Sequence, residues 1–337
     1  MYQVTEFDIN DVRIKVEDAP EVAFPAHADC NSPCWWQGGS LNILTSTGHP
    51  VLSSGQDFST LAVKGEITYT AYRDGGRWME AVHQTSDGTL FGWYHNEPAH
   101  LMPPEMQEGR RFPLTAPFIG ATVSYDNGLT WDDLGLVLAG GTETLNLATP
   151  NFFFAGGNGD FTVILDRRQE FFYFVFGTYY RNPEQQGVSL ARMRVEDLHA
   201  PVGKVMKWHE GSFSEPGLNG QVTPIFPVVG DWYGPNPDAF WGPSIHWNTE
   251  IEQYVILMNR AVDRNWKQSG VYIVCTADLA DPEAWSEPQL ALEVDGWYPQ
   301  VIGSDTEKRE TDREAGHVAR LFIHGESRHQ ICFAKRS

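Results

Sequence analysis

Five acidic residues stand at the start of, or just beyond, aromatic-rich segments of this chain. They are Asp29, Glu80, Glu97, Asp160 and Asp238. Carboxyl groups that converge in a fold push their pKa values apart, so that one keeps a proton while another is ionised. This division of roles is what general acid–base cleavage of an acetal bond requires. For such a reaction, the secondary structure around these five residues must bring their carboxyl groups to one place.

Four of the carboxyl groups begin a unit that recurs with variations. Each unit has a short apolar or aromatic run, a polar turn with Gly, Asn or Asp, and a second aromatic-rich run, which predicts a β-hairpin. The units cover residues 29–46, 80–95, 160–179 and 238–259. A fifth unit, 297–325, carries Tyr298 and Gln300 where the carboxylate would be. A radial arrangement of the hairpins would bring their leading residues together at one site.

The composition favours an all-β fold. Aromatic residues make up 13% of the chain, and 32 Gly and 21 Pro supply turns for many short strands. Further strands are predicted in the segments 119–126, 135–140, 187–194, 270–278 and 330–335. Repeats of roughly 40 to 70 residues are typical of propellers. We predict one domain over residues 1–337, a five-bladed β-propeller with mostly four antiparallel strands per blade. Residues 12–16 or 3–9 would supply an N-terminal strand that closes the ring.

One short motif has a structural meaning of its own. Residues 124–131 read SYDNGLTW and resemble the Asp-box of sialidase-like propellers, a turn between the third and fourth strands of a blade. The resemblance implies that Ser124 and Asp126 bond local backbone, that Gly128 has a positive φ, and that Trp131 packs beneath the turn. We interpret the motif as structural and not catalytic.

The blade pattern as a whole resembles the five-bladed propeller glycoside hydrolases, the group that contains families 43, 32, 62 and 117. The resemblance to family 43 implies that Asp29, at the head of the first hairpin, is the general base. It implies that Asp160, in the third blade, orients and tunes the site. The fourth blade departs from the pattern, because residues 240–244 read FWGPS where that family has a Glu before Gly-Pro.

This departure leaves the general acid open: the second blade offers Glu80 and Glu97, and Asp238 in the fourth blade is a further candidate. Glu80 is predicted at the strand position equivalent to Asp29 and Asp160, while Glu97 follows the second strand of the hairpin. The family 32 motif and the sialidase arginine arrangement are absent from the sequence. The resemblance implies inversion, with carboxyl groups roughly 6.5 to 9.5 Å apart.

A sugar site also needs flat apolar platforms and hydrogen-bonding side chains. The candidates for substrate binding lie in or beside the hairpin strands: His95, Asp238, Trp241, His246, Trp297, Tyr298 and Gln300. Strand alternation predicts that Thr162 and Ile164 share a face with Asp160.

No residue pattern requires a cofactor. The 11 His form no compact metal motif. The resemblance leaves room for a structural Ca²⁺ on the propeller axis, assisted by His95, His246 or His324. The four Cys are interpreted as buried free thiols, with Cys30 and Cys34 on one face of a strand and too far apart for an easy disulfide.

The net charge of −20 argues against nucleic acid or an anionic membrane as a partner, because both require basic patches. A carbohydrate is the expected partner, and the oligomeric state is left open. The first ten residues have neither a basic start nor an apolar core, which predicts a cytoplasmic location for this chain. Removal of a signal would instead leave a secreted or periplasmic protein.

Two classes of function remain from the sequence. The first is a glycoside hydrolase that degrades a poly- or oligosaccharide, with one axial funnel lined by carboxylates. The second is a carbohydrate-binding propeller without catalysis, for which several equivalent peripheral sites are expected. A lyase or a phosphorylase is a third alternative, but a phosphorylase needs a basic pair beside the carboxylates, and Arg167 and Arg168 lie in a predicted turn.

Overall fold

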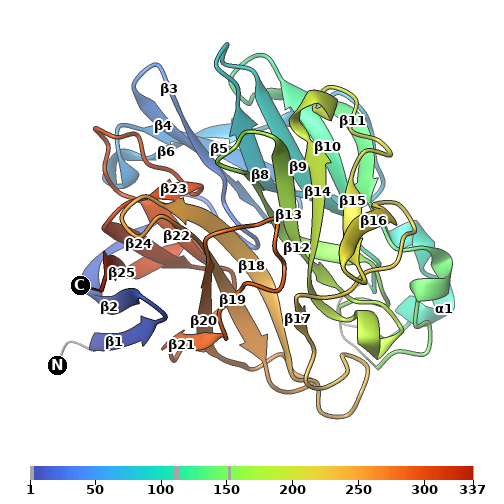
Figure 1. Cartoon of the computed structure of the whole chain (residues 1–337). Helices are drawn as coiled ribbons and strands as arrows, with labels where there is room; N and C mark the ends of the chain where they lie inside the picture. The colour runs from blue at the N-terminus through green and yellow to red at the C-terminus, as the bar shows by residue number, and fades with distance from the viewer. Residues whose placement is uncertain (1–3, 110–113, 151–152, 337) are drawn as a thin grey trace.

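A computed structural model describes residues 4–109, 114–150 and 153–336. Five small, mostly antiparallel sheets stand around a common centre, and each forms one blade of a β-propeller (Figure 1). The predicted all-β, five-bladed architecture is confirmed. The described helices are short, and none of them is long and apolar enough to cross a membrane.

The blades are numbered here in chain order of their inner strands. Blade I contains β3 (Cys34–Gln37), β4 (Ser40–Ser46), β5 (Pro50–Gly55) and β6 (Ala62–Glu66). Blade II contains β8 (Gly76–Gln84), β9 (Leu90–Glu97), β10 (Phe118–Ser124) and β11 (Thr130–Leu138), with β7 (Thr68–Tyr69) parallel to β11. Blade III contains β12 (Asn158–Leu165), β13 (Phe171–Thr178), β14 (Gly187–Arg194), β15 (Met206–His209) and β16 (Ser212–Pro216), with β17 (Phe226–Pro227) paired to β14.

Blade IV contains β18 (Ala239–Asn248), β19 (Gln253–Ala261), β20 (Gln268–Thr276) and β21 (Gln289–Leu292), with β23 (Glu314–Ala315) parallel to β18. Blade V contains β22 (Pro299–Gly303), β24 (Val318–Ile323), β25 (Glu326–Lys335), β2 (Val12–Ala23) and β1 (Val4–Ile9). The helical elements are α1 (Pro104–Gln107) and the 3₁₀ turns η1 (Phe58–Thr60), η2 (Ala99–Leu101), η3 (Thr142–Thr144), η4 (Pro183–Gln185) and η5 (Val195–Asp197).

All five predicted units contain an antiparallel strand pair, and four of them are tight hairpins. The fifth differs, because a long connection between β22 and β24 includes β23, which joins the sheet of blade IV. A second difference concerns Cys30, which lies in a bend ahead of β3 and not on a strand. The cysteines are free, and Cys332 is only half-buried.

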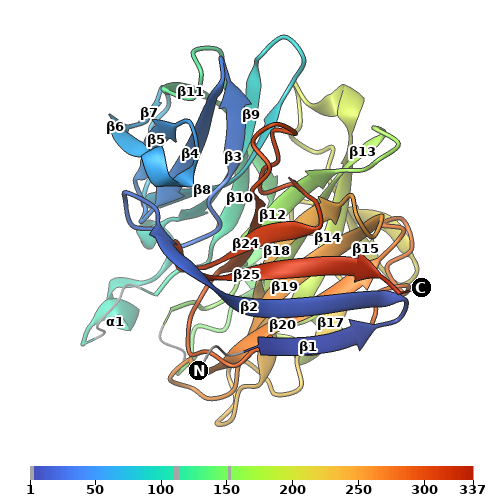
Figure 2. The same cartoon turned by 90° about the vertical axis from the view of Figure 1, so that its left-hand side faces the viewer.

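The ring closes between the two ends of the chain. β2 pairs with β25 from Val12 opposite Lys335 to Ala23 opposite Glu326, and β1 pairs with β2 (Figure 2). The sequence predicted one closing strand from either of two segments, whereas both segments are used. The pairing covers an edge of β25 that would otherwise expose unpaired backbone groups.

The core lies between the blades. Every pair of neighbouring blades is joined by its own cluster of buried apolar side chains, of which the cluster between blades II and III contains Phe91, Phe161 and Phe174. A strand presents alternate side chains to the two faces of its sheet, and in a propeller both faces are covered by neighbouring blades. The inner strands are therefore held rigidly around the centre.

The SYDNGLTW turn joins β10 to β11, the third and fourth strands of blade II. The Asp126 carboxylate accepts hydrogen bonds from Ser124 Oγ (2.9 Å) and from the backbone N–H of Thr130 (2.9 Å). Gly128 has a φ of +86° and Trp131 is fully buried. These contacts hold the turn between the third and fourth strands of the blade.

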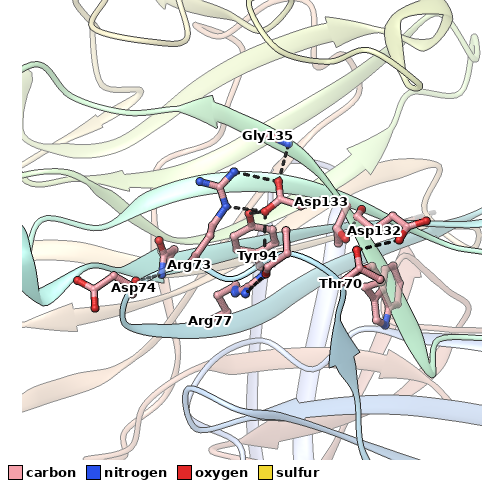
Figure 3. Close-up of polar contacts among 12 residues, drawn as sticks. Thr70, Arg73, Asp74, Arg77, Tyr94, Asp132, Asp133 and Gly135 are labelled. Carbon is pink, nitrogen blue, oxygen red and sulfur yellow. Dashed lines mark hydrogen bonds and ion pairs between the residues drawn. The ribbon is translucent and has the colours of Figure 1, made fainter.

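A polar cluster fastens the outer edge of the same blade (Figure 3). The Asp133 carboxylate accepts hydrogen bonds from Arg73 Nη2 (2.9 Å), Tyr94 Oη (2.8 Å) and the backbone N–H of Gly135 (2.6 Å). Tyr94 lies in β9, the strand that also carries His95 and Glu97. This cluster thus ties β9, which pairs with the innermost strand β8, to β11.

Candidate active site

A cavity of about 500 Å³ opens where the inner strands begin. Its polar lining consists of Asp29 from blade I, His95 and Glu97 from blade II, and Asp160 from blade III. These four residues were all singled out from the sequence, and they are separated by up to 131 positions along the chain. The radial arrangement of the hairpins brings them to one place.

Three inner strands carry a β-bulge near the cavity. The pairing is interrupted at Glu80 in β8, at Asp160 in β12 and at Gly242 in β18. Asp160 has a φ of +44° and Gly242 a φ of +59°. A bulge redirects a side chain out of the regular alternation, so the prediction that Thr162 and Ile164 share a face with Asp160 does not hold across the bulge.

Asp29 does not head a strand but lies five residues ahead of β3. Its backbone N–H donates to Ser46 O (2.8 Å), which fixes the loop against β4. Two residues later, the Asn31 amide donates to Phe161 O (2.8 Å) and Pro243 O (2.7 Å), tying the loop to blades III and IV. Burial and the charge of Asp160 raise the pKa of Asp29 to about 6, with His95 opposing the shift.

Blade II places two glutamates on either side of one imidazole. His95 Nδ1 lies 2.6 Å from Glu80 Oε1, and His95 Nε2 lies 3.2 Å from Glu97 Oε1. Glu80 is 1% exposed and does not line the cavity, whereas the Glu97 side chain is 35% exposed and does. The tertiary structure thus separates the two glutamates that the sequence left as alternatives for the proton donor.

Glu80 also reaches across to blade III. Its second oxygen accepts a hydrogen bond from the backbone N–H of Phe161 (3.0 Å), the residue after Asp160 at the bulge. Burial raises the pKa of Glu80, although the hydrogen bond and charge of His95 oppose this shift. Burial alone would lower the pKa of His95, but its hydrogen bonds to Glu80 and Glu97 raise it well above the ordinary value.

Asp160 is held by a phenol on the neighbouring strand end. The Tyr179 hydroxyl, just beyond β13, donates a hydrogen bond to Asp160 Oδ2. Burial raises the pKa of Asp160, and the charge of His95 together with the Tyr179 hydrogen bond opposes that shift. Because the Asp160 carboxylate is restrained in this way, it suits an orienting role better than a role in which the side chain has to move.

The rest of the cavity wall is aromatic. Trp241 packs edge-on against Trp266 (ring centroids 4.9 Å apart) and Trp297 (5.2 Å), and Trp78 stacks on the ring of His95 (4.8 Å). The predicted residues Trp241, Trp297 and Tyr298 line the cavity. The sequence analysis missed Trp78, Phe153, Phe154, Tyr179 and Trp266, which line it as well. Trp78 and Tyr179 could have been found, because one lies two residues from Glu80 and the other ends the third predicted hairpin.

Three predicted binding residues lie outside this cavity, and their placement is corrected here. Both carboxylate oxygens of Asp238 are engaged by Arg260 (2.7 and 2.8 Å). His246 is buried within β18 against Phe333, beyond the bulge of its strand. Gln300 is buried and bonds the backbone N–H (2.9 Å) and carbonyl (3.1 Å) of Ser32, so that it braces blade V against blade I.

The suggested axial Ca²⁺ does not fit the residues present. Among the described residues, the one group able to hold a metal ion is Glu80, His95 and Asp160, whose donor atoms lie within 4.8 Å of one another. Each of these side chains already has a protein hydrogen-bond partner, and Ca²⁺ requires six to eight oxygen ligands. The reaction proposed below therefore uses only side chains of the protein.

Similar solved structures share this architecture. A mutant of the α-L-arabinanase from Cellvibrio cellulosa matches with a TM-score of 0.53 at 12% identity, covering 92% of each chain. A thermostable family-43 glycoside hydrolase matches with a TM-score of 0.52 at 10% identity, covering 94% of this chain and 92% of the other. A GH43 β-1,3-galactosidase with galactodeoxynojirimycin matches with a TM-score of 0.51 at 11% identity, covering 93% and 94%. The chain has the fold of family 43 glycoside hydrolases. No protein-family profile and no curated protein matches the sequence.

Proposed function

We propose that this protein is a glycoside hydrolase that cleaves O-glycosyl bonds of a poly- or oligosaccharide. The observation that supports this most directly is the single cavity in which Asp29, Glu97 and Asp160 converge among aromatic walls. A pair of carboxyl groups flanking the bond is the usual equipment for glycoside hydrolysis, and aromatic faces suit the apolar faces of sugar rings.

In the proposed reaction Asp29 is the general base. With a pKa of about 6, its carboxylate is ionised at neutral pH and can remove a proton from water. The water oxygen bonds to the anomeric carbon while the bond from that carbon to the leaving oxygen breaks. Asp160, held by Tyr179, orients the ring or the water beside Asp29.

The proton for the leaving oxygen comes from Glu97, which is resupplied by His95 through the contact at Nε2. Glu80 serves as a positioning residue, because it acts on the sugar only through His95 and the Asp160 bulge. This assignment replaces the missing Glu of blade IV, where Trp241 stands before Gly242 and Pro243 and forms part of the aromatic wall. The donor therefore approaches the bond from blade II.

We further propose inversion at the anomeric carbon, on the basis of the resemblance to family 43. Direct attack by water on the face opposite the leaving group requires carboxyl groups roughly 6.5 to 9.5 Å apart. Proton NMR of the first product formed from an aryl glycoside distinguishes the outcomes, because retention would give the same anomer as the substrate.

The activity is tested with the purified protein on a panel of aryl glycosides, arabinans and galactans. Asp29→Asn, Glu97→Gln and Asp160→Asn are compared with Glu170→Gln, an exposed carboxyl at the opposite end of the β12–β13 hairpin. We expect the first three to lose activity and Glu170→Gln to keep it. Turnover that survives both aspartate substitutions would reject the site. Binding of a glycan without any turnover would support the non-catalytic alternative.

A further inference from the structure

A second cavity, of about 460 Å³, adjoins the candidate active site on the side of blade V. It lies beside the turn between β24 and β25, and its lining includes His27, Asp295, His324 and Arg328. None of these residues takes part in the proposed reaction.

Two chain segments connect the cavities. In the first, His27 lines the second cavity and Asp29, two residues on, lines the first. In the second, Asp295 lines the second cavity and Trp297 lines the first. His324 spans the junction, since its Nε2 atom lies 4.0 Å from Asp29 Oδ1 and its backbone N–H donates to Trp297 O (2.9 Å).

The lining of the second cavity is suited to a sugar ring. Val294 and Ile323 contribute apolar surface, while histidine, carboxylate and guanidinium groups supply hydrogen-bond donors and acceptors. The pKa of His324 is lowered, mainly by burial and to a smaller extent by His27, while the charge of Glu326 opposes the shift. A neutral imidazole at this junction can both donate to and accept from a hydroxyl group.

We propose that the second cavity binds a neighbouring sugar ring of the substrate, on the Asp29 side of the bond that is cleaved. This proposal rests on the proposed function and narrows its substrate to saccharides with at least two rings on the glycone side. In the proposed reaction the leaving group departs toward Glu97, and the attacking water is held by Asp29. A sugar ring in the second cavity lies on the Asp29 side and therefore belongs to the glycone. Aryl glycosides of a single sugar would fill only part of this site.

The test compares 4-nitrophenyl galactoside with 4-nitrophenyl β-1,3-galactobioside, and the corresponding arabinoside with the α-1,5-arabinobioside. We expect kcat/KM to be at least 10-fold higher for the two-ring substrate. His27→Ala and Arg328→Ala, both at exposed positions, should bring that ratio close to one and leave the one-ring substrate unaffected. His49→Ala, exposed and outside both cavities, is the matched control. A wild-type ratio near one, or a ratio that both variants retain, would overturn the proposal.

A binding measurement separates this proposal from the proposed function. The disaccharides β-1,3-galactobiose and α-1,5-arabinobiose are titrated into the Asp29→Asn variant while the histidine imidazole resonances are followed by NMR. We expect a disaccharide that binds to shift the resonances of His27 and His324 and to leave that of His49 in place. Binding that shifts neither, or no binding of either disaccharide, would count against the second cavity whether or not the wild-type protein turns over a glycoside.

Discussion

The Glu80→Gln substitution probes the buried connection between blades II and III. Gln has nearly the same shape as Glu, but its amide oxygen alone can accept a hydrogen bond. The backbone N–H of Phe161 requires an acceptor, so the amide NH₂ group must face His95 Nδ1. His95 Nδ1 can accept a hydrogen bond from this NH₂ group only when it carries no proton, so the imidazole must be neutral with its proton on Nε2.

The expected effect follows from the loss of one charge-assisted hydrogen bond. Such a bond is worth about 1.5–3 kcal/mol, against about 0.5–1.5 kcal/mol for a neutral one. The difference of about 1–1.5 kcal/mol corresponds to a decrease of about one unit in the pKa of His95. Because a negative neighbour is removed, the imidazolium is destabilised and the pKa moves down. The alkaline limb of the pH–rate profile should move to lower pH with it.

The assay combines the pH dependence of kcat/KM with NMR titration of the His95 ring. Glu80→Ala is the companion variant, since it leaves the Phe161 N–H unpaired and should cost about 2–5 kcal/mol in the free energy of unfolding. A His95 pKa that stays constant or rises in Glu80→Gln would refute the reasoning. So would a loss of activity without any movement of the alkaline limb, which would indicate a purely structural role.

Other expectations concern the catalytic carboxyl groups and the fold. Asp29→Asn and Glu97→Gln should each lower kcat by about 10²- to 10⁴-fold, the usual contribution of a general base or acid; an effect below 10-fold in either would remove that residue from its role. Activity of the wild-type protein should fall as the pH decreases through about 6, because the raised pKa of Asp29 places its protonation there; an acid limb near pH 4 in the kcat/KM profile would contradict this origin. Asp126→Ala should reduce stability by about 1–2 kcal/mol through the lost bonds to Ser124 and Thr130. Urea unfolding measures that change, and a catalytic defect in the folded variant would contradict a purely structural turn.

Much of the architecture could be predicted because it depends on local patterns. Strand pairs such as β12–β13 follow from aromatic and β-branched runs on both sides of a polar turn, which are visible in the sequence. Each propeller blade is built on such a local hairpin. When the hairpins are predicted correctly from the sequence, most of the fold follows. The closing pair β2–β25 was also foreseeable, since an all-β ring must cover its last edge.

The details of the site were less accessible. A bulge shifts alternation by one residue, and nothing in the letters around Asp160 signals it before the pairing partner is known. Asp238 was predicted because it begins the fourth unit and His246 because it lies in the strand that follows, yet Asp238 is held by Arg260 and His246 is buried on the far side of the bulge. Trp266 was missed because it comes from a loop beyond β19 that approaches the cavity only in three dimensions.

By itself the sequence determined that this chain forms a ring of hairpins and that Asp29 and Asp160 lie just ahead of, or near the start of, the first strand of two of them, because these are properties of neighbouring residues. It could not decide between Glu80 and Glu97. Only the tertiary structure separates their positions: Glu80 bonds His95 and Phe161 behind the cavity, while Glu97 lines it. The physical reason is that exposure to a cavity depends on which surfaces the other blades cover, and those surfaces belong to residues of other blades, such as Phe161 of blade III.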